Sequence, residues 1–188
     1  NNYWESEPGK NLTFSLLLKP WHIEPAKQFT ITMLVSLAIA KVIKRHLSHH
    51  QVSIKWPNDI YVEDKKIAGI LIQNSLKGNK LEHAIVGIGL NVNQTTFDAK
   101  TPNPTSLKIL NEQDTELEEL LGELLLELAS HYQVSYSAHY LSRINNAYLD
   151  KLYRLYRWTS FMEGEHMFTA RIMGIGEFGR LMLEMEDG

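Results

Sequence analysis

The chain has 188 residues, about one domain at roughly 150 residues per domain, with room for a small appendage. Hydrophobic residues make up 44% and charged residues 22%, which is typical of a folded globular chain and excludes a disordered or collagen-like one. A net charge of −3 argues against non-specific nucleic-acid binding, and the absence of cysteine excludes disulfides, thiolate metal sites and thiol nucleophiles.

The first half of the chain predicts short strands and one long helix. Leu12–Leu18 is an apolar run bounded by turn residues, as expected of a buried strand. Pro25 suits the first turn of a helix, and apolar residues then recur at helical spacing as far as Leu47. Alternating or apolar runs broken by turn residues predict four more strands, at 52–56, 60–62, 67–73 and 84–92.

The second half predicts, in chain order, a surface loop, two helices and a β-rich segment, at 102–113, 117–128, 137–153 and 167–185. Asp114 or Thr115 can cap the first of these helices. Together the elements predict an α/β domain of about 150 residues, followed by the beginning of a small β module.

The ends of the chain suggest an internal piece of a longer protein. It begins Asn1-Asn2 without an initiator Met or a signal segment, and it ends in an apolar run that enters a turn. The longest apolar stretch, Met33–Ala40, is far short of the ~20 residues that span a bilayer, so we expect no transmembrane helix and no membrane partner. The absence of cysteine agrees with a cytoplasmic location.

The most informative stretch is Lys55-Trp56-Pro57-Asn58-Asp59, followed by Lys66 and then Gly69-Ile70-Leu71. Pro57 cannot donate in a sheet ladder, so it ends a strand where an amide and a carboxylate appear. The next turn brings a lysine close to both of them. A hairpin with a solvated, charged turn is the alternative interpretation of this pattern.

A second cluster, Gly87-Ile88-Gly89-Leu90-Asn91, ends an otherwise apolar strand. Glycines inside a strand mark a bulge, or a place where something approaches the backbone closely. From the residues alone, a structural role and a ligand contact are both open.

Taken together, these motifs resemble the catalytic domain of biotin protein ligases, in that family's order and spacing, over nearly the whole chain. Lys55–Asp59 is similar to the family's KWPND motif, Lys66–Ile70 to its KxxGIL-type motif and Gly87–Asn91 to its GxGxN motif. The segment from Trp4 to Leu12 resembles the one that follows the family's glycine/arginine-rich loop. That loop, which closes over the ligand in the family, and the strand before it are not in this chain.

The resemblance implies an α/β (α+β) fold. It consists of a class II aminoacyl-tRNA-synthetase-like catalytic domain, with a mixed or antiparallel sheet flanked by helices, and the start of a small SH3-like β barrel. The catalytic domain would cover residues 1–152 and the incomplete barrel residues 153–188.

The resemblance also implies an activity. Family members use ATP and Mg²⁺ to convert biotin to biotinyl-5′-AMP, and then transfer biotin to one lysine of a biotin carboxyl carrier domain in a biotin-dependent carboxylase. The carrier domain is therefore the expected partner. A homodimer is compatible with the family, and nucleic acid would be a partner only if a helix-turn-helix domain preceded residue 1.

The resemblance assigns roles by motif position. Lys66 would be the cation that holds the biotin carboxylate and the α-phosphate together, since two anions repel. Asp59 would help to hold Mg²⁺, which prefers oxygen ligands, and would assist deprotonation of the acceptor amine. The biotin-binding residues would be Lys66, Gly69, Gly87 and Gly89, and the adenylate-binding residues Trp4, Asn58, Asp59 and Asn91.

Other functions share parts of this pattern. Lipoate ligases and octanoyltransferases share the fold and a lysine in an equivalent role, but the glycines at 69 and 87–89 favour biotin. A biotin-sensing repressor would need a helix-turn-helix of about 60 residues upstream of Asn1. A non-catalytic binding module would tolerate loss of Lys66.

Residues 174–179 also match GxGxxG, the dinucleotide-binding fingerprint. They lead into an apolar strand rather than a helix, so a β-turn is the better interpretation.

Overall fold

The computed structural model describes Trp4 and residues 6–99 and 101–186. In chain order the elements are β1 (Leu12–Leu18), the 3-10 turn η1 (Pro25–Lys27), α1 (Phe29–His46), β2 (Val52–Lys55), β3 (Asp59–Val62), β4 (Lys65–Lys77), β5 (Lys80–Leu90), α2 (Leu107–Asn111), α3 (Leu117–Val134), α4 (Ala138–Leu149), β6 (Trp158–Glu163), β7 (His166–Ile175), the 3-10 turn η2 (Glu177–Gly179) and β8 (Leu181–Met185).

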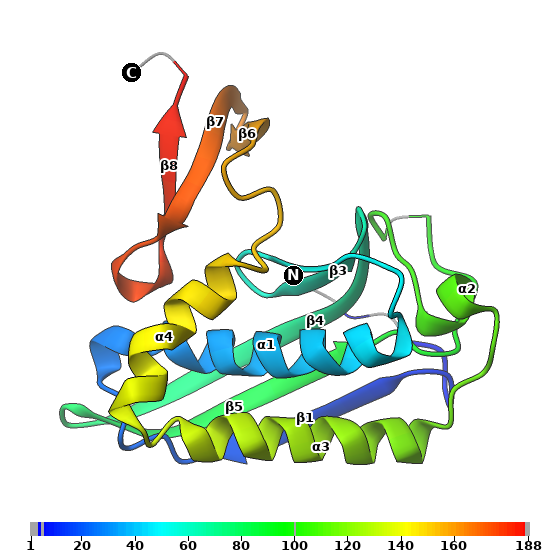
Figure 1. The fold of residues 1–188 in the computed structure, drawn as a ribbon, viewed down its shortest axis with the longest axis horizontal. Helices are drawn as coiled ribbons and strands as arrows, with labels where there is room; N and C mark the ends of the chain where they lie inside the picture. Colours follow the sequence, from blue (N-terminus) through cyan, green and yellow to red (C-terminus); the bar gives the residue numbers. More distant parts are fainter. Residues whose placement is uncertain (1–3, 5, 100, 187–188) are drawn as a thin grey trace.

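The strands form two antiparallel sheets. Five of them pair in the order β1-β5-β4-β3-β2, and the long β4–β5 hairpin turns at Gly78, whose φ of +59° is easy for a residue without a side chain. The other three pair in the order β6-β7-β8 and stand at one end of the larger sheet (Figure 1). The predicted α/β fold with an antiparallel sheet flanked by helices is confirmed, and the described C-terminal strands form an open sheet rather than a closed barrel.

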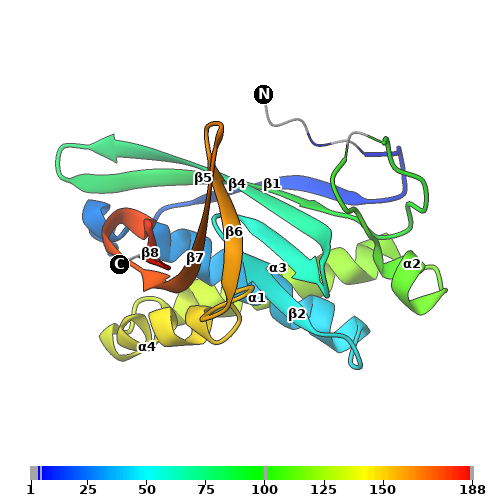
Figure 2. The ribbon, with the colours of Figure 1, turned by 90° about the horizontal axis from the view of Figure 1, so that it is seen from above.

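All the long helices lie on one face of the five-stranded sheet. Figure 2 shows α1, α3 and α4 on one side of it. Apolar residues at alternate strand positions, such as Phe14, Ile70 and Ile88, pack toward these helices. Within the described residues, no helix covers the opposite face, which we call the open face.

Pro25–His46 is a helical stretch of 22 residues, long and apolar enough by length and composition to cross a membrane. The shorter stretch Met33–Ala40, which Ser36 interrupts, understates this length, because a membrane-spanning helix tolerates a few polar residues. In the structure, 61% of its most apolar part is buried, and α1 packs against the sheet, α3 and α4. Burial, rather than composition, therefore supports the expectation that this helix does not cross a membrane.

Two sequence expectations about the middle of the chain are wrong. The segment expected to be only loop contains α2, whose N-cap Ser106 accepts a hydrogen bond from the Ile109 amide at 3.2 Å. Neither Asp114 nor Thr115 caps α3, because the Asp114 carboxylate binds Lys108 Nζ at 2.8 Å and the N-cap position falls on Glu116.

The segment between α4 and β6, which we call the linker, is hydrogen-bonded to both sheets. Ile54 of β2 donates to the Lys151 carbonyl at 2.7 Å and accepts from the Tyr153 amide at 2.8 Å. The Tyr156 amide donates to the Ile172 carbonyl of β7 at 3.0 Å. The expected boundary between residues 152 and 153 falls inside this linker and stays a prediction.

Glu127 of α3 is a buried carboxylate at the contact with α1. Its side chain is 7% exposed and accepts hydrogen bonds from Lys41 Nζ at 2.6 Å and from Arg45 Nη2 at 2.5 Å. Burial acts to raise the pKa of Glu127, but the hydrogen bonds from these two cations outweigh it and hold the pKa below its ordinary value. Charge therefore joins the two helices in addition to apolar packing.

Glu127→Gln should lower the free energy of unfolding at pH 7 by about 2 kcal/mol, because it weakens two charge-assisted hydrogen bonds. A carboxyl group whose pKa is lowered by folding stabilises the protein above its unfolded pKa, and that contribution is lost as the pH falls through the folded pKa. Urea unfolding should therefore show the full difference at pH 7 and a shrinking one below the ordinary Glu pKa of 4.5.

The matched control is Glu119→Gln, an exposed residue on the same helix, which should change the free energy of unfolding by less than about 0.5 kcal/mol. Equal unfolding curves for the two variants at pH 7 would contradict the prediction.

Candidate functional site

Three glycines replace side chains in the middle of the open face. Asp59, Gly69, Gly89 and Thr13 oppose one another across β3, β4, β5 and β1, so they occupy one row of the sheet. Gly87 lies in the next row on the same face, two residues before Gly89. We call Gly69, Gly87 and Gly89 the glycine floor.

An aromatic ring lies directly on the glycine floor. A Cβ added at Gly89 would come within 2.3 Å of the Trp4 ring, and one added at Gly69 within 2.9 Å. A Cβ at Gly87 would meet nothing closer than 3.6 Å, an ordinary contact. Gly69 and Gly89 are thus required by the close approach of a flat ring, whereas the described atoms do not require glycine at position 87.

Lys66 and Asp59 form an ion pair beside the floor. Lys66 Nζ lies 2.7 Å from Asp59 Oδ1, with the two side chains 27% and 20% exposed. A bulge in the β3–β4 pairing sets Tyr61 opposite Lys66, so β3 and β4 bring the two charges to the same end of the sheet. Lys66 Nζ is also 5.7 Å from the centre of a Trp4 ring, so cation, carboxylate and ring share one small region.

The backbone of Lys66 is fixed by the loop that precedes α2. Its amide donates to the Asn103 carbonyl at 2.8 Å, and its carbonyl accepts from the Thr105 amide at 2.9 Å. The Asn91 side-chain amide donates to the Thr105 carbonyl at 2.9 Å, and Asn91 is only 4% exposed. In this structure Asn91 holds the loop that holds Lys66, and its predicted adenylate contact stays a prediction.

Asn58 is likewise engaged with the scaffold. Its side-chain amide donates to the Ile70 carbonyl at 2.6 Å, while the Ile70 amide donates back to the Asn58 carbonyl at 2.9 Å. These bonds join the turn after β2 to β4. The preceding Trp56–Pro57 peptide bond is cis.

The structure therefore brings six of the eight predicted site residues onto the open face: Trp4, Asp59, Lys66, Gly69, Gly87 and Gly89. It places the side-chain amides of Asn58 and Asn91 on backbone carbonyls instead. Two neighbours on the same face, Lys55 and Tyr61, have no role predicted from the sequence. Lys55 Nζ lies 3.1 Å from the Tyr61 hydroxyl and over its ring, and both alternate with buried isoleucines, a period-two pattern that could have identified them.

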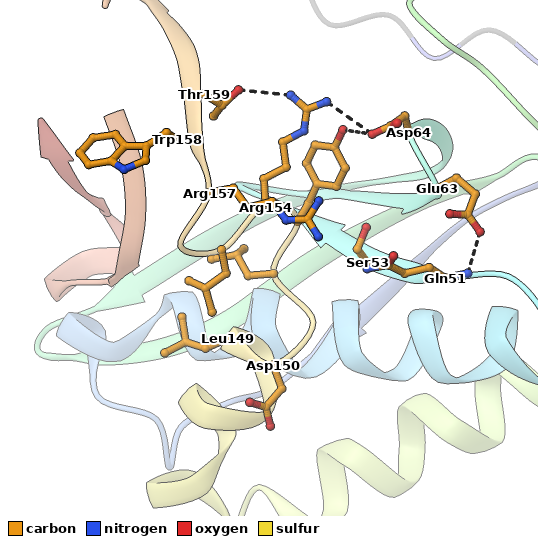
Figure 3. A pocket seen from close by; sticks show the side chains of 13 residues that line it. Gln51, Ser53, Glu63, Asp64, Leu149, Asp150, Arg154, Arg157, Trp158 and Thr159 are labelled. Carbon is orange, nitrogen blue, oxygen red and sulfur yellow. Dashed lines mark hydrogen bonds and ion pairs between the residues drawn. The ribbon is translucent and has the colours of Figure 1, made fainter. Parts of the chain in front are cut away.

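A hollow of about 720 Å³ lies away from this floor, between the edge of β2 and the linker (Figure 3). Two of its charged side chains, Arg154 and Asp64, interact with each other. Arg154 lies 3.4 Å from an Asp64 oxygen and 3.3 Å from the Thr159 hydroxyl, and the Tyr153 hydroxyl donates to Asp64. These contacts, the Tyr153 hydrogen bond first, lower the pKa of Asp64. The residues that line this hollow include none of the eight predicted site residues.

Comparison with known proteins indicates what this site resembles. A model of the biotin/lipoate A/B protein ligase family matches residues 1–91. The chain is 29% identical over 198 residues to a bifunctional ligase/repressor BirA of Bacillus subtilis, covering 98% of this chain. It is 28% identical over 137 residues to a biotin–[acetyl-CoA-carboxylase] ligase of Paracoccus denitrificans, covering 71% of this chain.

Among solved structures, the fold is similar to a biotin protein ligase from Aquifex aeolicus in complex with biotin and ATP. The TM-score is 0.75 at 26% sequence identity, over 95% of this chain and 73% of that one. The chain spans 57% of the length of both bacterial relatives above.

Gly89→Ala should expel the Trp4 ring from the floor, because the new Cβ would lie 2.3 Å from it. Acrylamide quenching of the Trp4 fluorescence, taken as the difference from the same protein carrying Trp4→Phe, should rise several-fold. Gly87→Ala is the matched control and should leave the quenching unchanged, since its Cβ fits. Equal quenching in the two variants would show that Trp4 does not depend on the glycine floor.

Proposed function

We propose that this chain is a member of the biotin/lipoate A/B protein ligase family and is the catalytic part of a biotin protein ligase. It would join biotin to AMP with ATP, and then pass the biotinyl group to a lysine of a carrier protein. The observation that carries this proposal is a floor of glycines that accepts a flat ring beside the Lys66–Asp59 ion pair. The Aquifex aeolicus relative was solved with biotin and ATP, which supports both as substrates here.

The glycine floor suits the biotin ring system. The Trp4 ring lies where Cβ atoms at Gly69 and Gly89 would stand, so a planar group can lie against this backbone at van der Waals distance. Biotin binding would displace Trp4 from the floor, and its indole would then pack against the adenine or cover the acyl-adenylate. In the structure the indole N–H is buried without a hydrogen-bond partner among the described residues, which makes this position easier to leave.

Lys66 would overcome the repulsion between the two reacting anions. In the first step a biotin carboxylate oxygen attacks the α-phosphorus of ATP, the bond to the β-phosphate breaks and pyrophosphate leaves. A fixed ammonium beside both groups stabilises the charge that develops on the phosphoryl oxygens. In the structure Lys66 is neutralised by Asp59 at 2.7 Å, so the substrate would take over part of this contact.

Asp59 is the carboxylate available to Mg²⁺ and to the acceptor amine. Mg²⁺ would arrive with ATP, held mostly by phosphate oxygens and one or two protein carboxylates. Asp59 fits this arrangement because it offers a carboxylate oxygen on the open face, beside Lys66. We propose that Asp59 supplies one oxygen ligand to MgATP when Lys66 turns to the substrate.

In the second step the carrier lysine must attack as a neutral amine. Its nitrogen forms a bond to the biotinyl carbonyl carbon, the bond from that carbon to AMP breaks and the amine proton is released. We propose Asp59 as the acceptor of that proton, because it lies beside Lys66 at the place where the adenylate would form. The Paracoccus denitrificans relative acts on acetyl-CoA carboxylase by name, so a carboxylase carrier domain is the proposed partner, in the cytoplasm. The adenylate contacts of Asn58 and Asn91, a homodimer and a nucleic-acid partner stay predictions.

Lys66→Ala should reduce acyl-adenylate formation by at least about a thousandfold while the protein stays folded, because a charge-stabilising group worth several kcal/mol is lost. The measurement is the yield of biotinyl-5′-AMP from radiolabelled biotin and MgATP without a carrier, separated by thin-layer chromatography. Lys65→Ala is the matched control, because Lys65 is exposed and adjacent, and it should retain full activity.

The same assay with lipoate tests the sister activity of the family. Lipoyl-adenylate without biotinyl-adenylate would replace the proposed substrate, and no adenylate from either acid would contradict the proposed enzyme. Equal loss of activity in Lys65→Ala and Lys66→Ala would remove the specific role of Lys66.

A further inference from the structure

The GxGxxG segment at residues 174–179 docks on the motif that begins with Lys55. Trp56 donates a hydrogen bond from its indole Nε1 to the Gly179 carbonyl at 2.8 Å, across 123 positions of the chain. The segment, which we call the docking turn, is closed by the Gly176 amide, which donates to the Arg180 carbonyl at 2.8 Å. It connects β7 to β8, so it belongs to the C-terminal sheet.

The docking turn fits closely against the first residue of α1. Gly179 has a φ of +79°, a backbone conformation that favours glycine, and a Cβ there would come within 2.3 Å of the Phe29 ring. Gly179 of the turn therefore lies close to both Phe29 and Trp56. Such close packing at a glycine indicates a specific contact between the C-terminal sheet and the larger sheet with its helices. We call this contact the joint.

A second contact with C-terminal residues fixes β2, the strand that leads into Trp56. Ile54 of β2 makes two backbone hydrogen bonds to the linker, one with Lys151 and one with Tyr153. Ile54 and Trp56 are therefore both bonded to C-terminal residues. Asn58 and Asp59 follow Trp56 directly, and Asp59 forms the 2.7 Å contact with Lys66.

We propose that Trp56 is a positioning residue and that the docking turn, through it, sets the position of Asp59 beside Lys66. The C-terminal sheet would thereby control acyl-adenylate formation without touching the substrate. This inference rests on the proposed function. It also predicts that displacing the docking turn loosens the backbone of β3, which amide hydrogen exchange can measure without an activity assay.

Gly179→Ala tests the joint from the C-terminal side. Alanine at this positive φ would meet Phe29 and displace the docking turn, so the kcat for acyl-adenylate formation should fall at least fivefold. The KM for biotin should stay the same, because the glycine floor lies on β4 and β5. Gly164→Ala is the matched control. Gly164 also has a positive φ, of +62°, in the C-terminal sheet, but no atom lies within 4 Å of its added Cβ.

Trp56→Phe tests the same joint from the motif side, since phenylalanine keeps an aromatic ring but has no N–H donor. Its kcat should fall about fivefold, the rate equivalent of one ordinary hydrogen bond. The double variant Trp56→Phe with Gly179→Ala should be no slower than the slower single variant, because both changes break one joint.

Unchanged kcat in Gly179→Ala would overturn the proposal, as would an equal loss in Gly164→Ala. If Trp56→Phe alone is slow, Trp56 acts directly on the substrate and not through the docking turn. Should the unmodified chain form no adenylate, the proposed function fails. Amide hydrogen exchange across residues 58–62 then tests whether the docking turn positions this segment. Faster exchange in Gly179→Ala than in Gly164→Ala supports the proposal, and equal exchange overturns it.

Discussion

The contact between Lys66 and Asp59 is the interaction around which the open face is arranged. The two opposite charges lie 2.7 Å apart, and each side chain is less than a third exposed. An ion pair between mobile, exposed side chains would lose most of its energy to solvent screening and side-chain entropy, so this pair depends on residues that are held in place. The structure supplies that setting twice. Backbone hydrogen bonds to Asn103 and Thr105 fix Lys66, and Asn58 binds the turn before Asp59 to β4. The pair is therefore placed by backbone, and its charges remain available to a ligand.

The layering of the fold leaves this pair accessible. The long helices cover one face of the five-stranded sheet and hold together through apolar packing and the buried Glu127 (Figure 2). The opposite face carries the glycine floor, the ion pair, short polar side chains and the exposed apolar side chains of Leu17, Leu71 and Ile85. An antiparallel sheet permits this division, because successive side chains point to opposite faces. Stability and ligand binding are thereby assigned to different sides of the same strands.

Local sequence patterns predicted most of the elements. The bounds expected for β1 are the observed ones, since an apolar run between turn residues has clear ends. β4 and β5 are longer than expected. Their residues near the hairpin are polar, so the composition does not indicate a strand, but their backbones pair as far as Lys77 and Lys80. α2 has only five residues, too few to show a helical period.

Within the site, the motifs identified the residues of the ion pair and of the glycine floor, because these residues lie in a few short segments of the sequence. The destinations of the Asn91 and Asn58 amides could not be predicted, since each depends on a carbonyl of another segment. The hydrogen bond from Trp56 to Gly179 joins residues 123 positions apart, and only the packing of the second sheet creates it. Asp114 was expected to cap α3 for its residue type, but a nearby lysine binds it instead.

The most direct test of the account is a crystal structure of this protein with biotin bound. We expect the biotin ring system on Gly69 and Gly89, its carboxylate within hydrogen-bond distance of Lys66 Nζ and the Trp4 ring displaced from the glycine floor. Biotin bound elsewhere, for instance in the hollow beside Arg154, with Trp4 still on the floor, would contradict it.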